Sequence, residues 1–273
     1  MKAVVVIPVY KSQLNDREYT SFEACCRILR KYTLCLVTYN QFDDTVYCQI
    51  ACLYNVKLQV EYFEDYYFKN IHGYNRLMLS ADFYHRFDEF RYMLVYQLDA
   101  YVFRDELQKW CGCDFDYIGA PLFAPGFRYS TQYALVGNGG FSLRKTQVFE
   151  SLFHTKLTWH QLLQVKYPKN PYINWRKKIV YTLMLWALGR FDGLFYFLTY
   201  FVDEDRFFSC ALLGTSMKLS VPPVEKAMFF AFDQGGAFWF DQTKCVLPFG
   251  VHAWSHDSTY KNFYCRFIPL QHE

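Results

Sequence analysis

The chain has 273 residues, of which 52% are hydrophobic and 21% aromatic, and a formal net charge of +3 at pH 7. A chain of this length can bury one large core. The small net charge, and the lack of a basic stretch long enough to follow a phosphate backbone, argue against a nucleic-acid partner. The ten cysteines show no CxxC pairing, which fits a reduced, cytoplasmic setting.

The first hundred residues alternate between strand and helix patterns. The apolar run at 1–8 is too short for a signal peptide and is expected as the first strand. Asn15 and Glu18 form a capping box that predicts a helix ending near Arg30. The other expected elements are strands over 33–39, 57–63 and 93–98 and helices over 45–54 and 74–87. This alternation predicts parallel strands with right-handed crossovers, and therefore a nucleotide-binding half over residues 1–103.

A single carboxylate, Asp99, ends the uncharged fourth strand in the segment YQLDAYVF at 96–103. Ligands of open α/β sheets bind beyond the carboxyl ends of the strands, so this position predicts an acid at a binding crevice. The alternative is that Asp99 only turns the chain.

Three glycines, Gly137, Gly139 and Gly140, follow in the second part of the chain, after a short helix expected near 105–110 and a strand at 117–120. They would let a ligand approach the backbone closely, or form a tight bend between strands. The segment is not a dinucleotide-binding fingerprint, because it lacks GxGxxG and lies far from the first strand.

The segment 166–178 interleaves basic and aromatic residues and precedes an apolar run that extends to residue 202. This pattern fits either a membrane-surface patch or a solvated helix entry followed by a core helix. Arg190 and Asp192 lie near the middle of the run. Each charge would cost about 2.5 to 3.5 kcal/mol inside a bilayer, which argues against a transmembrane helix.

Two later groups of side chains could carry chemistry. Asp203, Glu204 and Asp205 precede an expected helix, and capping needs only one or two of them, so one could act as a general base. His252 could be an ordinary hydrogen-bonded residue, or it could complete a divalent-cation site with Asp99.

Several segments together resemble the GT-A class of sugar-nucleotide-dependent glycosyltransferases, and specifically a bacterial polysaccharide group known as DUF5672. They are VVIPVYK at 5–11, HGYNRLMLS at 72–80, YQLDAYVFRDEL at 96–107, DYIGAP at 116–121, GNGGFSLR at 137–144, DEDRFFS at 203–209 and PFGVHAW at 248–254. The resemblance implies one α/β, GT-A-like (nucleotide-diphospho-sugar transferase) domain over residues 1–273, with a mixed, mostly parallel central sheet flanked by helices. Residues 104–273 would then form the acceptor-side half.

The resemblance also implies site residues. The donor nucleotide would contact Pro8, Val9, Tyr10, Lys11, Asn75, Asp99, Ala100 and Tyr101. Asn138, Gly139 and Gly140 would shape the donor-sugar and acceptor pocket, and Asp99 with His252 would hold Mn²⁺ or Mg²⁺ together with the donor diphosphate. Ala100 and Tyr101 stand where a DxD motif would continue to a second Asp, so the metal motif is incomplete. Asp205, with Glu204 as the alternative, matches the base of inverting members.

The implied function is that of a hexosyl- or related sugar transferase. It would move a sugar from a nucleotide-diphospho-sugar, with a UDP-sugar as the first choice, to a hydroxyl of a glycan or lipid-diphosphate-linked glycan by inverting direct displacement. The expected location is the cytoplasm, with peripheral contact at the inner membrane face through segment 166–178. A sugar-nucleotide pyrophosphorylase and a non-catalytic carbohydrate-binding protein are the alternatives.

Overall fold

The computed structural model describes residues 1–123, 129–131, 134–154, 204–208 and 218–270. The basic aromatic segment 166–178, the apolar run that follows it and Asp203 lie outside the described residues. Among the helices that are described, none combines the length and hydrophobicity needed to cross a bilayer.

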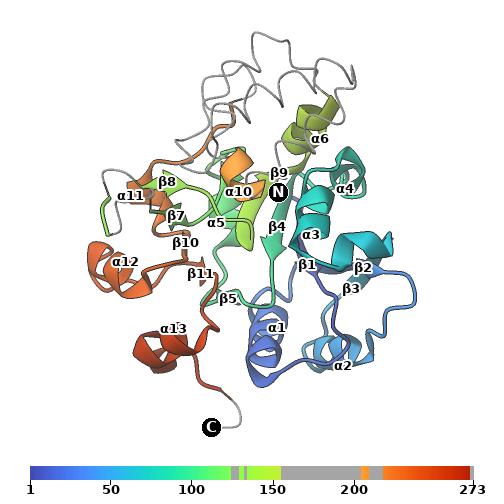
Figure 1. Cartoon of the computed structure of the whole chain (residues 1–273), viewed down its shortest axis with the longest axis horizontal. Helices are drawn as coiled ribbons and strands as arrows, with labels where there is room; N and C mark the ends of the chain where they lie inside the picture. The colour runs from blue at the N-terminus through green and yellow to red at the C-terminus, as the bar shows by residue number, and fades with distance from the viewer. Residues whose placement is uncertain (124–128, 132–133, 155–203, 209–217, 271–273) are drawn as a thin grey trace, which may run out of the picture.

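A six-stranded sheet with the order β3-β2-β1-β4-β9-β6 forms the centre of the fold (Figure 1). Its strands are β1 (Ala3–Pro8), β2 (Thr33–Tyr39), β3 (Leu58–Phe63), β4 (Tyr92–Tyr96), β6 (Tyr117–Ile118) and β9 (Phe141–Lys145). The pairs β1–β2, β2–β3 and β1–β4 are parallel, whereas β9 runs antiparallel to both β4 and β6. The expected α/β fold class with a mixed, mostly parallel central sheet is therefore confirmed.

Helices cover both faces of this sheet. Alternate residues of β1 explain the two layers: Val5 and Ile7 pack into one hydrophobic cluster, and Val4 and Val6 pack into another. The first cluster takes side chains from α1 (Asp16–Ile28), α2 (Thr45–Leu53) and α5 (Leu107–Cys111). The second takes them from α3 (Ile71–Met78), α4 (Ala81–His85) and α6 (Thr146–His154). The strand is buried on both faces, as its β-branched run predicts.

The helix starts follow the chemistry of their caps. Asn15 accepts hydrogen bonds from the backbone of Arg17 and Glu18, and the Glu18 side chain accepts one from the Asn15 backbone, which confirms the predicted capping box. The prediction of a single helix over residues 74–87 is wrong. Two helices, α3 and α4, form instead, because the Ser80 side chain caps a new start by accepting from the backbone of Phe83.

Smaller sheets attach the C-terminal segments to the centre. β5 (Tyr101–Val102), β10 (Ala231–Phe232) and β11 (Gly250–Val251) form a three-stranded sheet, and β7 (Pro121–Leu122) pairs with β8 (Leu135–Val136). β11 runs antiparallel to β5, with Val251 opposite Tyr101. This pairing places the PFGVHAW segment beside the chain that follows Asp99.

The remaining described elements are short helices. They are η1 (Asp65–Phe68) in the first half, then α10 (Glu204–Arg206), α11 (Val224–Ala227), α12 (Gly236–Gln242), α13 (Asp257–Asn262) and η3 (Tyr264–Arg266). In Figure 1, α12 and α13 lie away from the central sheet, on the side of β10 and β11.

Candidate functional site

Asp99 and His252 meet at the carboxyl end of β4. Asp99 follows this strand, and His252 follows β11 directly. The pairing of β11 with β5 brings Nε2 of His252 to 3.2 Å from Oδ1 of Asp99. Asp99 and His252 are 153 positions apart in the chain, and the structure places them side by side. The sequence predicted that both belong to one site.

Three further side chains surround the imidazole. Oδ1 of Asp233 lies 3.2 Å from Nδ1, where Nδ2 of Asn138 is also 2.9 Å away, and Oε1 of Gln97 lies 3.2 Å from Nε2. Burial acts to lower the pKa of His252, but the charges of Asp99 and Asp233 outweigh it and raise this pKa to about 10. The ring is therefore an imidazolium at neutral pH when no cation is bound.

The Asp99 carboxylate responds in the opposite direction. Burial acts to raise its pKa, but the positive charge and the hydrogen bond of His252 outweigh burial, so the pKa lies below the usual value. Asp99 is thus held as an anion, which is the form that a cation or a hydrogen-bond donor needs.

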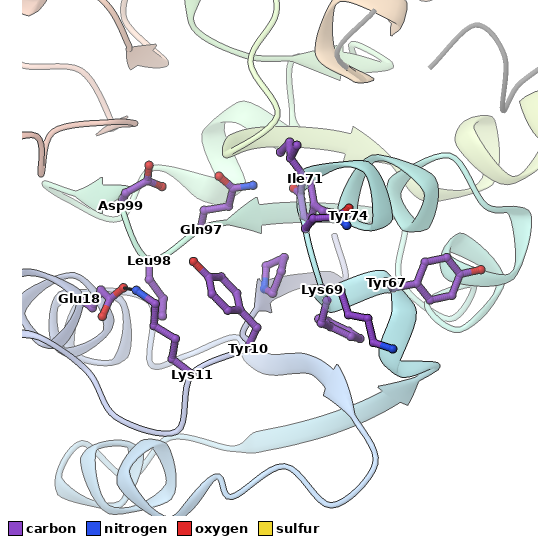
Figure 2. A pocket seen from close by; sticks show the side chains of 13 residues that line it. Tyr10, Lys11, Glu18, Tyr67, Lys69, Ile71, Tyr74, Gln97, Leu98 and Asp99 are labelled. Atoms are coloured by element: carbon purple, nitrogen blue, oxygen red, sulfur yellow. Dashed lines mark hydrogen bonds and ion pairs between the residues drawn. The ribbon is translucent and has the colours of Figure 1, made fainter. Parts of the chain in front are cut away.

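A pocket of about 480 Å³ opens beside Asp99. Its walls come from the end of β1, from η1 with the start of α3, and from residues 97–99 after β4. Figure 2 shows Lys11 and Glu18 at one end, Lys69 and Tyr67 at the other, and Tyr10 and Gln97 between them. The pocket therefore lies at the carboxyl ends of β1 and β4, where open α/β sheets bind ligands.

Lys11 already has an anionic partner in this pocket. Its Nζ lies 2.7 Å from Oε1 of Glu18, and this hydrogen bond raises the pKa of Lys11 above its usual value. The backbone carbonyl of Lys11 accepts a hydrogen bond from Tyr47. The loop after β1 is thus fixed both by the helix cap of α1 and by α2.

Four predicted donor-binding residues lie elsewhere. Val9 and Ala100 are fully buried, and Tyr101 packs edge-on against Trp254 in the core. Asn75 is buried in α3. None of the four lines the pocket, so their contact with a donor stays a prediction, whereas Pro8, Tyr10, Lys11 and Asp99 do line it.

The glycine segment 137–140 connects β8 to β9. The side chains of Glu204 and His252 pack against two consecutive residues of this segment, Gly139 and Gly140. A Cβ on Gly140 would overlap the His252 ring and lie 2.7 Å from Oε1 of Gln97. A Cβ on Gly139 would lie 2.9 Å from the carboxylate carbon of Glu204. Both glycines therefore leave room for neighbouring side chains, and the segment is also the bend between strands that the sequence offered as an alternative.

Glu204 forms a buried ion pair with Arg144. Oε1 of Glu204 lies 3.0 Å from Nη2, and the side chains are 3% and 0% exposed. The guanidinium also donates to Tyr84 Oη, Ser142 Oγ and the carbonyl of Gly139. Asp205, the next residue in the chain, is half-buried.

The sequence interpretation missed three of these residues. Gln97 and Asp233 each end a short apolar run, as Asp99 does, and that position was a usable signal. Arg144 gave none, because a charged side chain in a strand is normally read as exposed.

A divalent cation fits this arrangement in part. Nε2 of His252 faces oxygens of Asp99 and Gln97, while Nδ1 faces the Asp233 carboxylate, which is how metal-binding histidines are usually oriented. Within the described part of the chain, no group of three or more His, Cys, Asp or Glu side chains could hold a metal. A cation here would therefore need diphosphate oxygens and water to complete its ligands.

Three solved structures resemble this chain in fold at low sequence identity. Mouse xyloside xylosyltransferase 1 is 12% identical with a TM-score of 0.49, covering 94% of this chain and 98% of that one. GlyE of Streptococcus pneumoniae is 14% identical with a TM-score of 0.48, covering 96% and 57%. Core-mannan synthase A of Aspergillus fumigatus is 10% identical with a TM-score of 0.43, covering 55% and 60%. The chain thus spans little more than half the length of the latter two.

No curated protein matches the chain. Residues 57–252 match the model of a family described as "Protein of unknown function (DUF5672)". Because this match covers well over half of the 273 residues, the chain belongs to the DUF5672 family.

Proposed function

We propose that the protein is a glycosyltransferase that moves a sugar from a nucleotide-diphospho-sugar to a hydroxyl of a glycan or lipid-linked glycan. The observation that carries the proposal is the 3.2 Å approach of Asp99 and His252 at the edge of a pocket of about 480 Å³. The GT-A-like motifs in which these two residues stand support it further.

The pocket supports a nucleotide as the bound part of the donor. Its volume lies within the ~300 to 1,000 Å³ typical of small-molecule sites. It combines an exposed aromatic ring, Tyr10, with the cations Lys11 and Lys69. Rings of this kind stack on bases, and ammonium groups bind phosphates. A UDP-sugar is the first candidate.

Asp99 and His252 would hold Mn²⁺ or Mg²⁺ jointly with the donor diphosphate. The cation would supply charge neutralisation for the departing nucleoside diphosphate. Asp233 orients the imidazole through Nδ1, and Gln97 places an amide oxygen beside Nε2. Gln97 would thus stand beside the cation in place of the second Asp that the incomplete DxD motif lacks, while Asp233 would act only through the imidazole.

Asp205 is the general base of this proposal, with Glu204 as the alternative. Oε1 of Glu204 is held by Nη2 of Arg144 at 3.0 Å, so Oε2 is the oxygen left to contact a substrate. Asp205 would take the proton of the acceptor hydroxyl as that oxygen attacks the anomeric carbon, which gives inversion.

Binding and turnover measurements test the proposal together. Calorimetry with UDP, GDP, CDP and their sugars, with and without Mn²⁺, should find one nucleotide whose binding is stronger with the cation. Asp99→Ala should lower turnover of the matching sugar nucleotide by about 100-fold or more. The matched control is Asp88→Ala, since Asp88 is 57% exposed and precedes the amino end of β4.

Two other outcomes of these measurements would identify the alternative functions. Nucleotide-sugar binding without any transfer or hydrolysis would identify a carbohydrate-binding protein. Formation of a nucleoside triphosphate from pyrophosphate would identify a pyrophosphorylase. Failure to bind any of the nucleotides would contradict the proposal. The cytoplasmic location is proposed on the spacing of the cysteines, and the peripheral membrane contact on segment 166–178. Flotation with anionic liposomes at low and high salt tests the membrane contact.

A further inference from the structure

Several buried side-chain atoms have no hydrogen-bond partner among the residues that the structure describes, and two of them lie on the side of β4 and β9 where the pocket opens or Arg144 is buried. They are the hydroxyl of Tyr74 and Oε2 of Glu204. Tyr74 projects from α3 and lines the pocket (Figure 2). Glu204 is 3% exposed. Buried polar atoms are almost always paired in native proteins, so two unpaired ones in one region indicate a group that binds there.

Both atoms belong to the surroundings of one guanidinium, that of Arg144. Glu204 accepts from it at 3.0 Å. Burial first, and then the negative charge of Glu204, raises the pKa of Tyr74, while Arg144 acts to lower it. The Tyr74 hydroxyl therefore lies within electrostatic range of both charged groups.

The guanidinium of Arg144 is not available to bind a ligand. Its donors contact Tyr84, Ser142, the Gly139 carbonyl and Glu204, and its side chain is fully buried. The arginine therefore fixes Oε1 of Glu204 and leaves Oε2 as the acceptor that remains.

The neighbourhood adjoins the Asp99–His252 site. His252 packs on Gly140 and Glu204 packs on Gly139, and consecutive Cα atoms are about 3.8 Å apart. Gln97 contacts Nε2 of His252 and also lowers the pKa of Tyr74, without meeting the geometry of a hydrogen bond to it. The group bound next to the diphosphate of a sugar nucleotide is its sugar.

We propose that Tyr74 and Glu204 form a hydroxyl-binding site for the donor sugar. The Tyr74 hydroxyl donates to a hydroxyl of the sugar, and that sugar hydroxyl donates to Oε2 of Glu204. One sugar hydroxyl satisfies both atoms, because it accepts one hydrogen bond while it donates another. The inference rests on the proposed function and deepens it: the donor carries a free hydroxyl at one defined ring position. It makes Glu204 a substrate-binding residue and leaves Asp205 as the base.

Tyr74→Phe tests the site without breaking the Arg144–Glu204 pair. Dissociation constants are measured by calorimetry for the sugar nucleotide and for the bare nucleoside diphosphate. We expect the sugar nucleotide to bind about three- to tenfold more weakly, as for one neutral hydrogen bond, and the bare nucleotide to bind as in the wild type. Thermal stability should not fall, because the lost hydroxyl has no partner in the described protein. In the matched control Tyr62→Phe, at an exposed position of β3 that does not line the pocket, the ratio of the two constants should stay that of the wild type.

Deoxy analogues of the donor sugar identify the hydroxyl. With the wild type, one deoxy position should reproduce the loss seen in Tyr74→Phe. With Tyr74→Phe, that same analogue should bind no more weakly than the full sugar, since both changes remove one interaction.

Two results overturn the inference alone. One is equal weakening of both ligands by Tyr74→Phe, and the other is unchanged sugar-nucleotide binding, which would mean that the two atoms hold only water. A wild-type protein that binds no nucleotide would instead contradict the proposed function, and the inference with it.

Discussion

His252 occupies the space in which a side chain at Gly140 would begin. A Cβ at residue 140 would overlap the imidazole and lie 2.7 Å from Oε1 of Gln97. Three segments that are distant in sequence, after β4, before β9 and after β11, therefore meet at one point. Residue 140 has to be glycine because of this close approach, and not because of a left-handed backbone, since Gly140 has no positive φ.

Gly140→Ala should displace the His252 ring and lengthen its contact with Asp99. Misplacement of a site group by about 1 Å can cost about 100-fold in rate, and we expect a loss of turnover of that order. The measurement is sugar-nucleotide turnover with Mn²⁺. Gly112→Ala is the control, because a Cβ there meets its nearest atom at 3.3 Å on the surface end of α5. Wild-type turnover in Gly140→Ala would show that His252 takes no part.

Asp233→Asn should weaken cation binding without removing either proposed ligand. Asp233 contacts Nδ1 of His252, while the cation would bind at Nε2. Substitution of such outer carboxylates typically lowers metal affinity about 10- to 100-fold, because they orient the ring and make it more basic. Calorimetric titration with Mn²⁺ in the presence of the nucleotide measures this change. Asp241→Asn, at an exposed position of α12, should leave the Mn²⁺ affinity unchanged, and an equal loss in both variants would argue against the orienting role.

Patterns within single segments of the sequence were enough to predict the first strand and the start of the first helix. The run at 4–7 predicted a strand buried on both faces, and Asn15 with Glu18 predicted the start of α1. Asp99 was found because strand periodicity ends at it. Ser80 could have revealed the break between α3 and α4, since serine is a strong helix cap, but the apolar spacing across 74–87 favoured one helix.

Tertiary pairing determined what the sequence could not predict. Arg144 is buried only because Glu204, 60 residues later, neutralises it. Tyr101 follows the strand-end acid, yet its ring packs on Trp254, because β5 pairs with β11. Such contacts depend on which segments meet, and periodicity within one segment does not contain that information.

Removal of one partner of the Arg144–Glu204 pair should destabilise the fold. Arg144→Met leaves a buried carboxylate without its counter-charge, and we expect a loss of about 3 to 5 kcal/mol in the free energy of unfolding. Combining it with Glu204→Gln should cost less than Arg144→Met alone, because no uncompensated charge then remains. Urea denaturation of the wild type, both single variants and the double variant measures this coupling. Strictly additive losses would mean that the pair contributes nothing as a pair.

Glu18→Gln should separate the two roles of Glu18. The side chain completes the capping box with Asn15 and pairs with Lys11 at 2.7 Å. Glutamine can serve in a capping box, so the free energy of unfolding should change by no more than about 0.5 kcal/mol. The loss of a negative charge from the pocket should leave Lys11 available to the donor diphosphate. We therefore expect nucleotide affinity to rise about two- to fivefold at low salt, the amount that one exposed ion pair typically contributes, and the gain to shrink in 0.5 M salt as screening increases.

The control for this change is Glu61→Gln. Glu61 also forms an ion pair, with Arg86 at 3.0 Å, but it lies on β3 and does not line the pocket. Its loss should leave nucleotide affinity unchanged at either salt concentration. If Glu18→Gln weakens binding, the pair orients Lys11 toward the ligand instead of competing with it, and Glu18 then belongs to the binding site itself.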